Sequence, residues 1–177
     1  MTLFTLVIFL TTNCRITSHG VHPYGIIRSS MFQIDTVKLV NSIDAELRKV
    51  NSQARSYTKV TDDFFGASSE GGQADFYYDK KVLKKIITVQ FGEVGKVSTE
   101  YFIDTSNHVY CILSTQSMYD KPMYEKGSKV ESIEKNRFYF HDNRLIRWDK
   151  SGKVINVGSD AFKVKENELL NLEIFKN

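Results

Sequence analysis

The sequence has little cysteine, little proline and almost no excess of charge of either sign. Its 177 residues include two cysteines and two prolines, and 24 lysine and arginine side chains are nearly balanced by 21 aspartate and glutamate side chains, a formal net charge of +3. So few cysteines exclude a disulfide-dense scaffold, and so few prolines exclude a proline-rich linker. The small positive excess gives no basis for binding phosphates, so we expect no nucleic-acid partner.

Motifs of common active sites are also lacking. The chain contains no phosphate-binding glycine loop, no zinc helix with paired histidines, no GxSxG nucleophile turn and no calcium-binding loop. His19 and His22, in the sequence HGVH, would need a third metal ligand from elsewhere in the chain. We therefore expect no cofactor and no metal, and we assign no catalytic residue.

The chain does contain enough apolar material for one folded domain. It is 41% hydrophobic and 12% aromatic, with 25% charged residues. This composition is too apolar for a disordered chain, and 177 residues are enough for one domain with a real core but would be cramped for two.

A short apolar segment, Leu3 to Leu10, lies near the N-terminus and reads LFTLVIFL. It is too short to span a bilayer, which needs about 20 residues, but it matches the apolar core of a signal peptide. No basic residue precedes it, which is atypical of such signals. We predict that residues 1–13 form a signal peptide, and the alternative is a buried N-terminal strand.

The sequence from Leu10 to Cys14 resembles the lipobox of bacterial lipoproteins, although Asn13 replaces the usual small residue. The resemblance implies that Cys14 is the lipidation site and that the protein is exported and lipid-anchored in the periplasm or outer membrane, with the membrane as a partner. Residues 14–30 then form a tether, because they show no sustained period. Cleavage without lipidation, or a Cys14–Cys111 disulfide, are the alternatives.

Two helices are predicted, one on each side of a run of strands. Apolar residues between Asp35 and Ser56 recur every three or four positions, which is typical of an amphipathic helix that Asp35 or Thr36 caps. A second helix is expected from Ser159 onward. The glycine-rich run Phe64 to Gly72 is interpreted as the connection between the first helix and the strands.

Three similar segments point to hairpins. FYYDKKVLKKI, YFIDTSNHVYCI and FYFHDNRLIRW each place large apolar residues before a polar turn with aspartate, and an aliphatic residue after it. Large residues favour strands and aspartate favours turns. The chain is therefore predicted to be α+β, an antiparallel β-meander of about six strands packed against an N-terminal and a C-terminal helix. Residues 31–177 are taken as a single domain.

The candidate binding residues lie in one long connection and near the turns. Ser117 to Asn136 is longer than a usual hairpin loop and would expose an adaptable surface. Two histidines near corresponding turns could share one rim of the sheet, and one tryptophan could stack on a sugar. The candidate binding residues are Met118, Tyr119, Met123, Tyr124, His108, His141 and Trp148.

The segments TEYFIDTSNHVYCIL and FYFHDNRLIRWDKSGKV resemble the YYF…DNGKL…W hairpins of small uncharacterised exported proteins and lipoproteins of Gram-negative bacteria. A more distant likeness is to MORN-type hairpin repeats, whose regular glycines this chain lacks. The first resemblance implies an envelope location and a hairpin fold, and it supplies no catalytic residue.

We expect an envelope-anchored binding module without catalysis, with a protein or a glycan as its partner. One alternative is a cell-wall or glycan hydrolase, or an inhibitor of one, that uses the rim of His108 and His141. Another is an assembly subunit that pairs through an edge of its sheet, which a long unguarded edge strand would favour.

Overall fold

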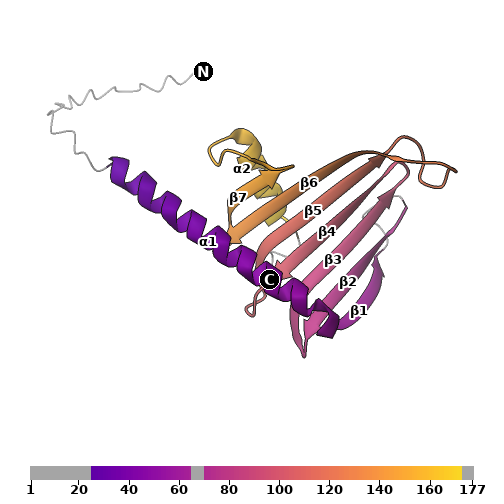
Figure 1. The fold of residues 1–177 in the computed structure, drawn as a ribbon, viewed down its shortest axis with the longest axis horizontal. Helices are drawn as coiled ribbons and strands as arrows, with labels where there is room; N and C mark the ends of the chain where they lie inside the picture. Colours follow the sequence, from indigo (N-terminus) through magenta and orange to yellow (C-terminus); the bar gives the residue numbers. More distant parts are fainter. Residues whose placement is uncertain (1–24, 65–69, 173–177) are drawn as a thin grey trace, which may run out of the picture.

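The computed structural model describes residues 25–64 and 70–172, and the predicted signal peptide and Cys14 lie outside them. In this part of the chain a long helix precedes a run of strands, and a short helix follows them (Figure 1). The elements are α1 (Gly25–Gln53), η1 (Ala54–Ser56), β1 (Thr58–Phe64), β2 (Gly72–Asp79), β3 (Val82–Gly92), β4 (Gly95–Ile103), β5 (Val109–Tyr119), β6 (Val130–His141), β7 (Arg144–Lys150), β8 (Lys153–Val154) and α2 (Asp160–Leu170).

The strands form one antiparallel sheet in chain order, so the predicted α+β meander is confirmed with eight strands where about six were expected. Three turns, β2–β3, β4–β5 and β6–β7, share one end of the sheet, which we call the proximal end. The β3–β4 turn and the β5–β6 loop lie at the other end, the distal end. The two hydrophobic cores lie toward the proximal end, and the long β5–β6 loop lies at the distal end.

Each of the three similar segments is a hairpin, as predicted, and two of the turns show the expected aspartate or asparagine chemistry. In the β4–β5 turn the Asp104 carboxylate accepts hydrogen bonds from the backbone N–H groups of Ser106 (2.7 Å) and His108 (2.9 Å). In the β6–β7 turn Asp142 and Asn143 both adopt positive φ, 49° and 55°. Aspartate and asparagine tolerate this left-handed geometry better than most residues, which explains their recurrence.

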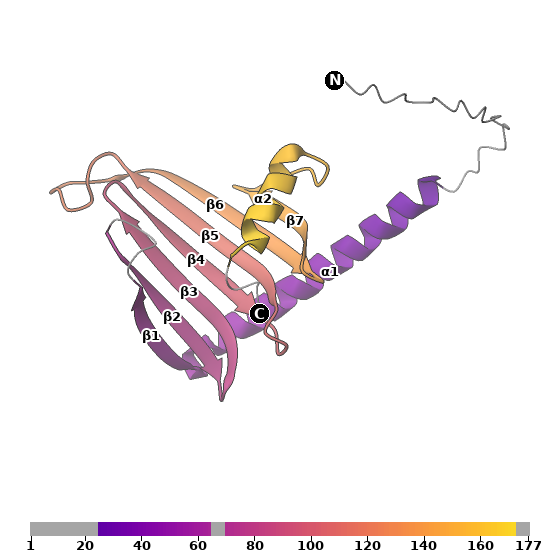
Figure 2. The ribbon, with the colours of Figure 1, turned by 180° about the vertical axis from the view of Figure 1, so that it is seen from behind.

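The large side chains of the hairpins supply two cores, one on each face of the sheet. On one face, Phe102, Cys111 and Tyr139 are buried against Val40, Leu47 and Val50 of α1. On the opposite face an apolar row crosses six strands and packs with Phe162 of α2. Its members are Phe76, Ile86, Tyr101, Ile112, Phe138 and Trp148. Figures 1 and 2 show α1 and α2 on opposite sides of the sheet.

The first helix starts earlier than the sequence predicted. It begins at Gly25, so Asp35 and Thr36 lie inside it and do not cap its start, and residues 25–30 are helical instead of forming part of a tether. No proline occurs between residues 24 and 121, so nothing in the covalent chain stops the helix from extending toward the N-terminus. From Thr36 onward, where the burial of its side chains is described, the first buried core residue of α1 is Val40. Its first turns extend beyond the sheet in both views (Figures 1 and 2).

Two strands were missed. β1 follows the helix directly, so the connection from helix to sheet lies at Ala54–Ser56, and the predicted connection Phe64 to Gly72 instead joins β1 to β2. β8 is only two residues long and follows a tight turn in which Ser151 and Gly152 have φ values of 46° and 84°. Both strands lie at the edges of the sheet, where few apolar side chains mark the period.

The C-terminal helix is confirmed with its cap. The Ser159 hydroxyl accepts a hydrogen bond from the backbone N–H of Phe162 at 3.2 Å, which satisfies one free donor of the first turn. Phe162 is 1% exposed, and Leu169 and Leu170 pack against the same core. None of the described helices is long and apolar enough to cross a membrane.

Candidate functional site

Neither helix covers the distal half of the sheet. Between Thr88 and Arg137, leaving out the proximal hairpin 101–112, Ser117 is the one buried residue of β3 to β6. The cores lie near the proximal turns, where α1 crosses the strands. The distal half therefore presents sheet faces and loops that are available to another molecule.

The β5–β6 loop at the distal end is held in place by its own hydrogen bonds. The Lys129 N–H donates to the Asp120 carboxylate at 2.8 Å, and the Lys121 ammonium donates to the carbonyl of Lys126 at 2.9 Å. The Met123 N–H donates to the carbonyl of Glu93 in the β3–β4 turn at 3.0 Å. The loop is therefore joined to the neighbouring turn, and its shape exists before any partner arrives.

Large apolar side chains gather around this loop. Tyr124 is 75% exposed at its tip, and Val94, in the adjacent turn, is 40% exposed. Phe91 and Ile133 lie in one row across β3 to β6, on the face that α1 covers at the proximal end. We call this group the distal patch; its members are Phe91, Val94, Tyr124, Val130 and Ile133. Exposed apolar side chains at one end of a sheet make this surface a candidate for contact with a partner.

Carboxylates surround Tyr124, and Glu93 acts on it most strongly. The Tyr124 hydroxyl donates to the Glu93 carboxylate at 3.4 Å. The nearby negative charge of Glu93 raises the pKa of Tyr124 above that of a free tyrosine, so the phenol stays neutral and keeps its proton for hydrogen bonding. Tyr124 can therefore offer its apolar ring to a partner, while its single O–H group already donates to Glu93.

The predicted contact residues of the long connection are divided between strand and loop. Met118 and Tyr119 extend β5 and are half-buried, so the irregular loop is shorter than Ser117 to Asn136 suggested. Met118 packs over Gly95, where an added Cβ would lie 3.0 Å from the Met118 sulfur. Met123 is half-buried in the loop, and Tyr124 is fully available.

Trp148 is a core residue, so the suggestion that it stacks on a sugar is wrong. It is 7% exposed, its ring lies 5.6 Å from that of Phe138, and its indole N–H donates to the Asn136 side-chain oxygen at 2.8 Å. The indole ring packs against Phe138, and its N–H group is already hydrogen-bonded to Asn136. A residue of this kind stabilises the sheet and offers no free platform to a ligand.

His108 and His141 lie at the proximal end, as the rim hypothesis required, but each faces the carboxylate of its own turn. His108 Nδ1 lies 3.8 Å from Asp104 Oδ2, and His141 Nε2 lies 3.5 Å from Asp142 Oδ2. Both histidines are exposed. Among the residues that the structure describes, no group of three or more histidine, cysteine, aspartate or glutamate side chains could hold a metal ion.

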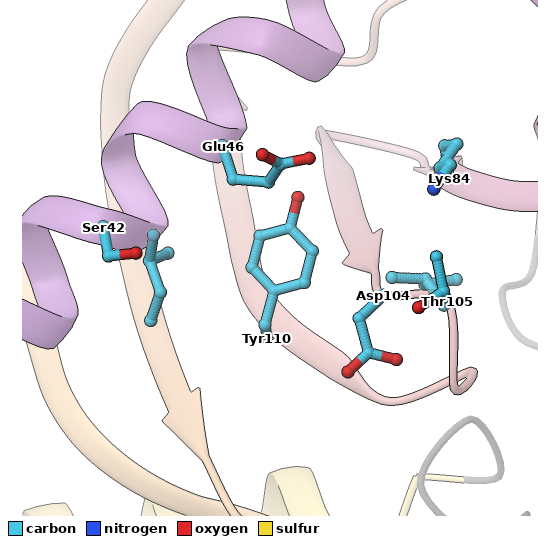
Figure 3. A pocket seen from close by; sticks show the side chains of 8 residues that line it. Ser42, Glu46, Lys84, Asp104, Thr105 and Tyr110 are labelled. Atoms are coloured by element: carbon cyan, nitrogen blue, oxygen red, sulfur yellow. The ribbon is translucent and has the colours of Figure 1, made fainter.

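A cavity of about 290 Å³ lies at the proximal end between α1 and the β4–β5 turn (Figure 3). Glu46 and Tyr110 face each other in its wall. The Tyr110 hydroxyl is buried and finds no hydrogen-bond partner among the described residues. Burial, and then the Glu46 carboxylate, raise the pKa of this phenol, so it remains neutral and is unsuited to act as a base. Asp104 also lines the cavity, but its turn already uses the carboxylate.

Cys111 behaves as a small apolar residue. It is free and 0% exposed beneath α1. Burial raises the pKa of its thiol, so the thiolate that a nucleophile requires does not form near neutral pH. Neither His108 nor His141 faces it, because both side chains are exposed.

Sequence reasoning found Tyr124 but missed the other members of the distal patch. Phe91, Val130 and Ile133 sit in strands, where a single apolar residue is ordinarily assigned to the core. These residues are exposed because α1 and α2 pack elsewhere on the sheet. The alternation of apolar residues along a strand does not predict where the helices pack. Comparison of the chain with protein-family models, with curated proteins and with solved structures gave no match.

Proposed function

We propose that this protein is a non-catalytic binding module of the cell envelope that holds a protein partner at the distal patch. The observation that carries the proposal is the presence of five large apolar side chains, 37% to 75% exposed, at the end of the sheet that neither helix covers. A protein partner fits this chemistry better than a glycan, because aliphatic side chains dominate and the tryptophan is buried.

The order of the loop supports the proposal. A flexible loop loses conformational freedom when it binds, which weakens the complex. Here the links from Met123 to Glu93 and from Tyr119 N–H to the Val94 carbonyl (2.9 Å) join the loop and β5 to the β3–β4 turn. The patch is therefore preorganised, and most of its apolar area is available to stabilise a complex.

The position of the helix fits a tethered protein. The start of α1 and the β5–β6 loop lie at opposite ends of the molecule in both views (Figures 1 and 2). An anchor at Cys14, eleven residues before α1 begins, would leave the distal patch free. Bacterial lipoproteins carry several acyl chains on one cysteine, which makes such an attachment effectively permanent.

The anchor is tested by mass spectrometry of the membrane fraction of the source cells. We expect an N-terminal peptide that begins at Cys14 and carries a diacyl or triacyl mass, because cleavage before the cysteine precedes completion of the lipid group. Loss of the anchor in a Cys14→Ser variant would move the protein to a soluble fraction. An unmodified chain that retains Met1 in the cytosol would refute both export and anchoring.

The binding surface is tested with a double variant, Tyr124→Ala with Ile133→Ser. We expect retention of the partner from an envelope extract to fall by about tenfold or more, because central apolar side chains dominate protein interfaces. The free energy of unfolding should change by no more than about 0.5 kcal/mol per site, as is usual for exposed positions. Retention is measured by quantitative mass spectrometry of the bound fraction.

The matched control is Val157→Ser with Val164→Ser, which removes two apolar side chains that are 56% and 65% exposed but lie outside the distal patch. It should retain the partner as well as the unaltered protein. Equal retention by the patch variant, or an equal loss in the control, would contradict the assignment of the surface.

A further inference from the structure

The outer edge of β1 is open. The strand order places β1 at the end of the sheet, and its side chains from Thr58 to Asp63 are all exposed. It is seven residues long and pairs with β2 along its whole length. An edge of this length presents a row of backbone N–H and C=O groups that another strand can bind.

The opposite edge is closed by comparison. Beyond β7 lies the short strand β8, and the Ile155 N–H donates to the Trp148 carbonyl at 2.9 Å. The Leu145 N–H donates to the carboxylate of Glu166, from α2, at 3.0 Å. Side chains and backbone from outside the strand thus satisfy groups that an edge would expose. The described residues show no such cover on β1.

Two of the three charges of β1, Lys59 and Asp63, lie symmetrically about Thr61. The third, Asp62, lies on the other face and falls opposite Val60 in the pairing proposed below. Lys59 and Asp63 each lie two residues from Thr61, and because side chains alternate between faces, all three share one face. In an antiparallel pair of two β1 strands centred on Thr61, Lys59 of each copy lies opposite Asp63 of the other. Two ion pairs and a central threonine pair result, and both are favourable cross-strand pairs.

An existing contact holds Lys59 in place on this face. Its ammonium lies 2.8 Å from Asp75 of β2, and the Thr61 hydroxyl donates to the same carboxylate at 2.7 Å. The Lys59 side chain is still 46% exposed, and an ammonium has further donors available for a second carboxylate. Charges on an edge strand ordinarily repel a second copy, whereas the opposite signs here attract one.

We propose that β1 pairs antiparallel with β1 of a second copy of this chain, centred on Thr61, so that the two eight-stranded sheets become continuous. The pairing leaves the distal patch of each copy exposed, because the patch lies on β3 to β6. Seven residues per copy make a smaller contact than that of a permanent dimer, so we expect the dimer to be weak and to form in a concentration-dependent way.

The test is a charge exchange followed by sedimentation equilibrium of the full chain over a range of concentrations. Lys59→Glu brings two carboxylates together across the pair, because the new side chain lies opposite Asp63 of the other copy. Asp63→Lys likewise brings two ammonium groups together, opposite Lys59. Each variant alone should therefore dimerise about tenfold or more weakly. An equal mixture of the two variants should restore the affinity, because both cross-strand pairs again carry opposite charges.

Lys81→Glu is the matched control, since it reverses an exposed charge in the β2–β3 turn and should leave dimerisation unchanged. The Tyr124→Ala, Ile133→Ser variant should also dimerise normally, which separates this pairing from contacts through the distal patch. Thermal unfolding of each variant reports on folding, and Asp63→Lys alone suffices if Lys59→Glu is unstable. A monomer at all concentrations, undiminished dimerisation of Asp63→Lys, or a mixture that stays monomeric would overturn the proposal.

Discussion

Replacing Phe102 by alanine is expected to lower the free energy of unfolding by about 3–5 kcal/mol, a large share of the total stability of one domain. Phe102 is 0% exposed between the sheet and α1, where it meets Val40, Leu47 and Val50. Its removal leaves a cavity that a helix and a sheet cannot both close. Urea unfolding followed by circular dichroism measures the loss.

Phe91→Ala provides the control with the same change of side chain. Phe91 belongs to β3 and is 37% exposed at the distal end. We expect its removal to cost less than about 1 kcal/mol, because water already reaches the ring. A similar loss for both variants would mean that the distal half of the sheet is packed against something, in conflict with an uncovered patch.

The second large effect concerns the buried charge of Lys85. Its side chain is 8% exposed, its ammonium pairs with Glu100 and donates to Asn51 of α1 at 2.9 Å, and it lies 4.8 Å from the centre of the Phe102 ring. Glu100→Ala removes the balancing carboxylate and leaves a buried cation. We expect a loss of about 3 kcal/mol in the free energy of unfolding.

Lys85→Met separates the charge from the packing. Methionine keeps the length of the lysine stem, and the remaining Glu100 is 33% exposed, so water can solvate it. We expect this variant to lose less stability than Glu100→Ala, because the charge that it leaves unpaired, the Glu100 carboxylate, is the more exposed of the two. Chemical denaturation of both variants in the same buffer measures the difference; a greater loss for Lys85→Met than for Glu100→Ala would contradict the expectation that the buried cation is the more costly charge to leave unpaired.

The six central strands could be predicted because local chemistry determines them. Asp104 and Asp142 satisfy or tolerate the turn geometry, and the aromatic triplets before them require cover on both faces. That requirement predicts that the first helix covers one face and that the C-terminal tail, a partner or a curled sheet partly covers the other; α2 lies there in the structure. β1 was not predicted because Val60 is its one aliphatic residue, so its apolar side chains show no alternation. β8 was not predicted because two residues are too few to show an alternating pattern.

The candidate site was predictable only in part. Tyr124 lies between Pro122 and Gly127, which marks a loop, so its exposure follows from the sequence. Trp148 and Ile133 are both apolar strand residues, yet one is 7% exposed and the other 55%. The difference arises because α2 packs over the proximal half of the sheet and no described helix covers the distal half, an arrangement of distant segments that local patterns do not encode.

The most direct test of the central proposal is site-specific photo-crosslinking in intact source cells, with a photoreactive residue at position 124, 133 or 164. Positions 124 and 133 belong to the distal patch, whereas Val164 is 65% exposed on α2. We predict one discrete protein adduct, of the same partner, from positions 124 and 133 and none from position 164. The absence of an adduct at both patch positions, or the same adduct at position 164, would contradict a partner bound at the distal patch.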